Sequence, residues 1–215
     1  MKINIIAVAA AALTSSLLMT TPSMAEDDTS YRFEITPFTA YRTGGQFEQL
    51  DGDAKLKLEE STAFGLLLNG SVRPDAQWEV LYARQSTEID TQGLFDSGQS
   101  ADLKVDYYQF GGTLLFKGEA LRPFIALTIG MSRFDPQAGE FSAENFFSGS
   151  FGAGVQLLRS KRVGLRLEGR LYGTFVDENS RIFCGSDGGV GACLIQLEGS
   201  IVTQWEARAG VVFRF

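Results

Sequence analysis

Residues 201–215 read IVTQWEARAGVVFRF, and this stretch decides the fold. Mostly apolar side chains alternate with a set that includes the polar and charged ones, with a period of two. This is typical of a β-strand with two different faces. One face carries Ile201, Thr203, Trp205, Ala207, Ala209, Val211, Phe213 and Phe215. The other face carries Val202, Gln204, Glu206, Arg208, Gly210, Val212 and Arg214. The segment is long enough to cross a bilayer, which takes about 9–11 residues of tilted strand.

The same alternation occurs in seven earlier segments: 32–42, 62–72, 78–86, 106–116, 123–133, 147–157 and 165–176. Long connections (44–60, 88–103, 135–145 and 178–199) alternate with short ones (73–77, 118–122 and 159–163). This layout predicts an all-β fold, an eight-stranded antiparallel up-and-down transmembrane β-barrel with both chain ends at the short turns. Segment 78–86 fits least well because Arg84 falls on its apolar face, which indicates either a position at the membrane rim or a bulge.

Alternation alone does not say which face is inside, because a soluble sandwich buries its apolar face and a membrane barrel shows it to lipid. The polar face carries Glu and Arg on several strands, which suits a narrow barrel interior. The chain also ends on an apolar strand with Phe213 and Phe215. Aromatic residues near the predicted strand ends indicate a membrane girdle: Tyr41, Trp78, Tyr82, Tyr108 and Trp205.

Residues 35–45, ITPFTAYRTGG, resemble the first strand and the start of the first loop in small bacterial outer-membrane barrels of the OmpA/OmpX/OmpW type. The resemblance covers about residues 31–215 and rests mainly on pattern. It implies that the terminal strand, with Phe213 and Phe215, is what the outer-membrane insertion machinery reads.

Residues 1–25 have the features of a secretory signal peptide. Lys2 is followed by a mostly apolar run from Ile3 to Leu18, and Ser23-Met24-Ala25 is a small-x-small cleavage site. The alternative is an uncleaved anchor, but the run is shorter than the roughly 20 residues of a spanning helix. We expect export by the general secretory route and a mature barrel domain of residues 26–215 in the outer membrane.

Cys184 and Cys193 lie in one Gly-rich segment, RIFCGSDGGVGACLIQ. Two cysteines in an exported chain indicate a disulfide. The alternative, a metal site, is disfavoured because the chain has no His and no further Cys to complete a ligand set.

Composition excludes several classes of function. Beyond residue 25 there are 18 basic and 26 acidic residues, a net charge of −8, whereas nucleic-acid binding needs a basic surface. The absence of His removes Ser-His and Cys-His nucleophile pairs and most zinc sites. Outer-membrane lipid enzymes that resemble this architecture depend on a catalytic His. We therefore predict no enzymatic activity, no cofactor and no metal.

The four long connections contain 15 acidic and three basic residues, a net charge of −12. One interpretation is that their carboxylates gather divalent cations that bridge to lipopolysaccharide phosphates. The other, which we favour, is a solvated acidic surface that prevents aggregation.

The polar faces predict a charge network in the barrel lumen: Glu34, Glu79, Arg166, Glu168, Arg170, Glu206 and Arg208. We favour a closed, salt-bridged plug, because eight strands leave room for little more than side chains. This predicts a monomer with a structural or surface-interaction role, in contact with outer-membrane lipid and lipopolysaccharide. A narrow channel for small ions or solutes, gated by exchange of these pairs, is the alternative. A soluble lipocalin-like lipid binder is disfavoured by the charged interior.

Overall fold

The computed structural model describes residues 32–48, 55–90, 101–118, 120–137, 143–158, 160, 162–176, 184–187, 190–193 and 200–215. The predicted signal peptide lies outside these ranges. Tyr31–Phe215 make up one compact unit. The described residues include no helix long and apolar enough to cross a membrane.

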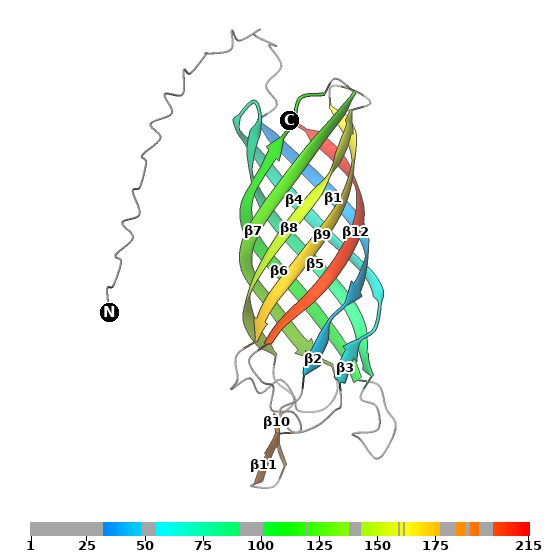
Figure 1. Cartoon of the computed structure of the whole chain (residues 1–215), viewed down its shortest axis with the longest axis vertical. Coiled ribbons are helices and arrows are strands. Elements are labelled where there is room, and N and C mark those ends of the chain that lie inside the picture. Colours follow the sequence, from blue (N-terminus) through cyan, green and yellow to red (C-terminus); the bar gives the residue numbers. More distant parts are fainter. Residues whose placement is uncertain are drawn as a thin grey trace, which may run out of the picture. The chain divides into compact units, whose positions relative to one another are not determined.

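Eight long antiparallel strands form a closed barrel, which confirms the predicted architecture (Figure 1). The ring runs β1–β4–β5–β6–β7–β8–β9–β12 and closes through the pairing of β12 with β1. The strands are β1 (Phe33–Gly44), β4 (Ser61–Arg73), β5 (Ala76–Asp90), β6 (Ala101–Leu115), β7 (Leu121–Pro136), β8 (Glu144–Leu158), β9 (Val163–Val176) and β12 (Ser200–Arg214).

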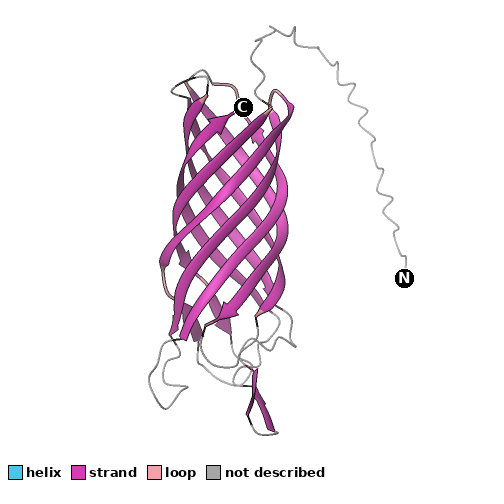
Figure 2. Cartoon of the chain, turned by 180° about the vertical axis from the view of Figure 1, so that it is seen from behind, coloured by secondary structure: helices cyan, strands magenta, loops and turns pink. Residues whose placement is uncertain are grey.

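Several strands continue beyond the predicted segments, and short strands lie within two of the predicted loops. β5 and β6 both extend past the predicted limits of 78–86 and 106–116, because alternation weakens there while pairing continues. β2 (Gln46–Glu48) and β3 (Lys55–Leu58) extend the barrel sheet through β5. β10 (Cys184–Asp187) and β11 (Val190–Cys193) form a separate two-stranded hairpin (Figure 2).

Both ends of the described chain lie at the barrel end that carries the short connections, here called the short-turn end. The Arg32 amide donates to the Phe215 carbonyl at 2.9 Å, and the Ser71 amide donates to the Arg32 carbonyl at 2.9 Å. Because Ser71 lies beside the β4–β5 turn, this confirms the predicted position of the strand ends. The opposite end is called the long-loop end.

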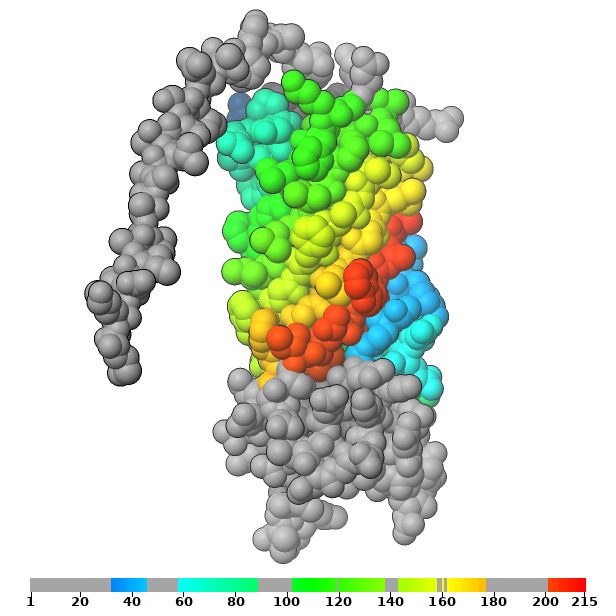
Figure 3. Space-filling view, viewed as in Figure 1, coloured from blue at the N-terminus to red at the C-terminus, as the bar shows by residue number. Residues whose placement is uncertain are grey.

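Burial alternates along the strands as the sequence predicts. In β9, Arg166, Glu168 and Arg170 are buried inside the barrel, while Leu165 and Leu167 are almost half exposed on its outside. Every long strand contributes at least one large apolar side chain that is more than a third exposed. The outer wall is therefore apolar and the lumen polar, the reverse of a soluble barrel. Figure 3 shows one side of this wall over β7, β8, β9 and β12.

Candidate functional site

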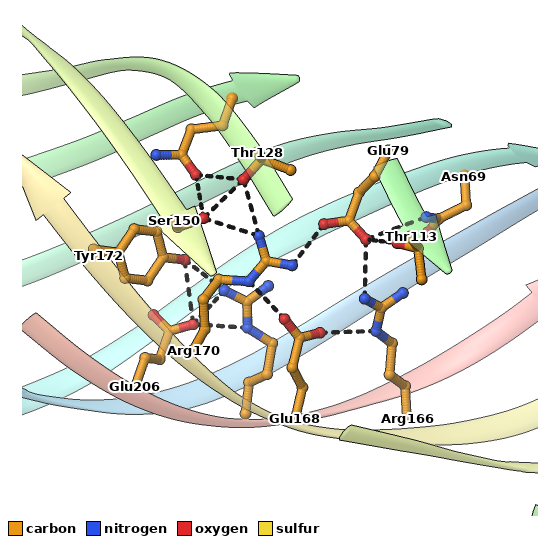
Figure 4. Close-up of polar contacts among 12 residues, drawn as sticks. Asn69, Glu79, Thr113, Thr128, Ser150, Arg166, Glu168, Arg170, Tyr172 and Glu206 are labelled. Atoms are coloured by element: carbon orange, nitrogen blue, oxygen red, sulfur yellow. Dashed lines mark hydrogen bonds and ion pairs between the residues drawn. The ribbon is translucent and has the colours of Figure 1, made fainter. Parts of the chain in front are cut away.

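The lumen contains an ion-pair cluster built from β9 and from the opposite strand β5. Glu79 of β5 accepts hydrogen bonds from Arg166 Nη2 at 2.9 Å and from Arg170 Nη2 at 2.6 Å. Glu168 lies between these two arginines on β9 and accepts from both of their Nε atoms. Thr113 Oγ1 also donates to Glu79, at 2.7 Å (Figure 4). The four charged side chains are at most 4% exposed. Each of these buried charges lies next to an opposite charge.

A second ion-pair cluster centres on Glu206 of β12. Its carboxylate accepts from Arg42 Nε at 2.8 Å and from Arg208 Nε at 2.7 Å. The Arg42 guanidinium lies 4.8 and 4.7 Å from the ring centroids of Tyr107 and Tyr172, which are themselves 4.4 Å apart. These rings supply cation–π contacts to a fully buried arginine.

Glu34 belongs to a third group near the short-turn end. It pairs with Arg214 Nε at 3.0 Å and accepts from Gln156 Nε2 at 3.2 Å. The structure thus places all seven residues of the predicted network inside the barrel, divided among three groups.

Sequence reasoning missed four main members of these groups: Arg42, Tyr107, Tyr172 and Arg214. Arg42 and Arg214 lie on the polar faces that alternation defines, so the pattern already pointed to them. Tyr107 and Tyr172 are fully buried and face the lumen, whereas the neighbouring Tyr108 faces outward. Alternation separates these faces, since it puts Tyr172 on the polar face of 165–176 and Tyr108 on the apolar face of 106–116. It does not indicate that a tyrosine on a polar face contacts an arginine.

Apolar residues lie in the lumen on both sides of the ion pairs. Toward the long-loop end, Phe134 and Phe146 pack edge to face with ring centroids 5.6 Å apart. They belong to a buried cluster that also contains Leu58, Leu103, Val105, Val176 and Val202. Toward the short-turn end, Leu115, Phe124 and Ala126 form a smaller cluster, and Arg166 stacks on Phe124 at 4.1 Å. The described lumen is therefore filled by side chains. Apolar residues lie on both sides of the Glu79 and Glu206 clusters, and the larger apolar cluster continues among the ion pairs, where Arg208 stacks on Phe38.

Among the described residues, the buried charges of the lumen are five arginines and four glutamates. Every one of these glutamates accepts from at least one arginine or pairs with one. Within the part of the chain that the structure describes, no group of three His, Cys, Asp or Glu side chains could hold a metal ion.

The predicted girdle residues lie on the outer wall, but not all of them are near strand ends. Trp78 packs edge to face with Phe33 near the short-turn end, with centroids 6.3 Å apart. Tyr82 and Tyr108 face each other across β5 and β6, 5.1 Å apart. Because β5 and β6 extend beyond the predicted segments, these two tyrosines lie near the strand middles and not at the ends. Tyr41 and Trp205 are both more than half exposed.

Arg84 lies on the outer wall, one step beyond Tyr82 on β5. The pairing of β5 is regular at Arg84, and the shift in the β4–β5 register lies between Ser71 and Arg73. The bulge that the sequence allowed at Arg84 is therefore wrong, because an ion pair with Asp106 accommodates the charge instead.

A pocket of about 480 Å³ lies at the long-loop end. Its lining includes the carboxylates of Glu59, Glu60, Glu88 and Asp102 together with Lys104. These acids belong to the predicted acidic connections, most of which lie outside the described residues.

No family profile matches the chain, and no curated protein matches its sequence. Solved structures do match its fold. The Neisserial surface protein A, NspA, is 15% identical, with 85% of this chain and 97% of that chain covered and a TM-score of 0.58. The outer membrane protein OprG from Pseudomonas aeruginosa is 11% identical, with 86% and 96% covered and a TM-score of 0.58.

The chain has the fold of the small outer-membrane β-barrels. At these identities the likeness concerns the fold alone. The outer-membrane barrel fold nevertheless explains why the apolar face is outside, since such barrels present an apolar band to lipid and a polar interior.

Proposed function

We propose that this chain is an integral outer-membrane β-barrel with a closed lumen and a structural or surface-interaction role. The observation that carries the proposal is the filled lumen, in which Glu79, Glu168 and Glu206 are held by arginines between two apolar clusters. A barrel of eight strands is just wide enough for side chains to fill it. In this proposal the acidic long loops make the contacts outside the cell.

The proposal includes the route to the membrane. Residues 1–25 direct export by the general secretory route, and the terminal strand with Phe213 and Phe215 is read by the insertion machinery. Both phenylalanines are exposed on the outer wall, at 40% and 66%, which is compatible with recognition of that strand. A closed ring leaves no long strand edge unpaired, which supports a monomer.

Conductance of the purified protein in planar bilayers tests the closed lumen. We expect stable insertion without resolved current steps, because ions would have to cross both apolar clusters. Regular current steps at neutral pH would contradict the plug and favour a channel. Insertion itself is followed by gel mobility, which should change on boiling, and by fractionation with outer membranes. A protein found only in the soluble periplasm would refute the membrane location.

A further inference from the structure

Charged side chains gather at one place on the outer wall, where the apolar stripes of β5, β6 and β7 end. Tyr82, Tyr108 and Met131 are register neighbours on these strands. The next outward-facing neighbours toward the long-loop end are Arg84, Asp106 and Arg133, which we call the outer-face cluster. Although these positions are close to the middles of β5 and β6, the apolar stripe ends here, and we infer that lipid headgroups begin at this point on these strands.

The contacts within the outer-face cluster leave one arginine without a counter-ion. Arg84 donates through Nε and Nη2 to the two oxygens of Asp106, at 2.7 and 2.9 Å, and the Tyr82 hydroxyl donates to the same carboxylate at 3.2 Å. The Arg84 side chain remains 39% exposed, while that of Asp106 is 6% exposed. Arg133 is exposed and forms no ion pair with any residue in the described ranges.

This arrangement does not recur on three of the other long strands. On β1, β4 and β8 the first outward-facing residues beyond the apolar stripe are Thr43, Thr62 and Asn145, none of which is charged. A general need for solvation at the membrane boundary would be met by such neutral residues. Arg84 of β5 and Arg133 of β7 are the register partners of Asp106 on its two sides. We take this pair of arginines as an indication that a specific anion binds here.

The surrounding charges limit where that anion can bind. One step farther toward the long-loop end, Lys104 stands opposite Asp135, and beyond them Glu88 stands opposite Asp102. The electrostatic potential therefore turns negative away from the cluster. An anion is favoured next to Arg84 and Arg133 and disfavoured at the acidic rim.

We propose that Arg84 and Arg133 bind a phosphate group of a phosphorylated glycolipid in the outer leaflet. The backbones of β5 and β7 are roughly 10 Å apart, with one strand between them, so that two long arginine side chains can reach the same headgroup. Guanidinium groups form bidentate, charge-assisted hydrogen bonds with phosphate oxygens. Asp106 holds Arg84 in position, and Arg133, which has no counter-ion among the described residues, gains one from the phosphate. The site rests on the outer-membrane location proposed above.

Native mass spectrometry of the purified protein in detergent tests the site. The probes are bis-phosphorylated lipid A and its dephosphorylated form, with inorganic phosphate as a competitor. The test variant is R84Q/R133Q. The matched control is R73Q/R162Q, which removes two exposed arginines near the short-turn end. We expect the wild type to prefer the phosphorylated lipid about tenfold and R84Q/R133Q to lose that preference, while the control keeps it.

Three results would overturn the site: an unchanged preference in R84Q/R133Q, an equal loss in R73Q/R162Q, or complete displacement of the lipid by inorganic phosphate. The last would indicate a free-anion site. Fractionation and the boiling-dependent gel shift are measured for every variant. A wild-type protein absent from outer membranes refutes the proposed function, whereas normal insertion without phosphate preference refutes the lipid site alone.

Discussion

At the residue scale, Glu79 accepts hydrogen bonds from four different residues of the lumen. It is fully buried, and the donors are Arg166, Arg170, Thr113 and Asn69. Removing one partner of a buried ion pair leaves an uncompensated charge, which costs about 3–5 kcal/mol. We expect Glu79→Ala to lower the urea midpoint of the refolded barrel accordingly. Glu88→Ala, at the exposed rim, should change the free energy of unfolding by no more than about 0.5 kcal/mol. Equal midpoints for both variants would show that the pairs contribute no stability.

Gly152 shows how a missing side chain makes room for the ion pairs. A Cβ atom on Gly152 would overlap Glu168 Oε1 and would lie 3.1 Å from Arg170 Nε. Both groups are fixed by their partners, so we expect Gly152→Val to destabilise the barrel by about 1–3 kcal/mol through overpacking. Gly169 faces outward with nothing within 4 Å of a built Cβ, which makes Gly169→Val the control. The prediction is wrong if both variants unfold at the same urea concentration.

At the element scale, alternation predicted the eight long strands and their inward faces because a strand fixes alternate directions for its side chains. It did not predict β2 and β3. These short strands lie in a polar connection, and β2 is reached through Gly44 and Gly45, whose positive φ angles of 84° and 100° turn the chain after β1. Alternation also could not tell that Glu34 pairs with Arg214 while Glu79 pairs with Arg166. Such partners depend on ring closure and register, which no single segment contains.

The β10–β11 hairpin contains the two cysteines of the predicted disulfide. Cys184 and Cys193 are register partners in it, and directly opposite residues of antiparallel strands have Cα atoms about 4.5–5.5 Å apart. That separation lies within the range that a disulfide spans. We expect denatured, unreduced protein to resist thiol alkylation and reduced protein to take up two labels. Labelling of both cysteines without a reductant would refute the bond. C184S/C193S should keep the urea midpoint of the barrel, because the hairpin is not paired with the barrel sheet.

At the scale of the whole molecule, closure of the ring determines both faces at once. The outer wall meets lipid, while in the lumen ion pairs of Glu79 join β5 to β9, and the ion pair of Arg42 with Glu206 joins β1 to β12. A sheet that stayed open could not place Glu79 of β5 against Arg170 of β9, since the two strands are not neighbours in the ring. The ion pair between Glu79 and Arg170 is therefore a property of the closed barrel and not of any strand pair.

The filled lumen gives the decisive test between a plug and a gate. If the ion pairs alone blocked the lumen, Arg170→Ala would open a path for ions, because it removes contacts to Glu79, Glu168 and Ser150 together. In the filled lumen the apolar clusters around Phe134 and Phe124 still exclude hydrated ions on either side. We therefore expect planar bilayers containing Arg170→Ala to stay as silent as those with the wild type. Insertion would be verified by the boiling-dependent gel shift. Current steps in the variant but not in the wild type would assign the barrier to the ion pairs, and the barrel would then be a gated channel.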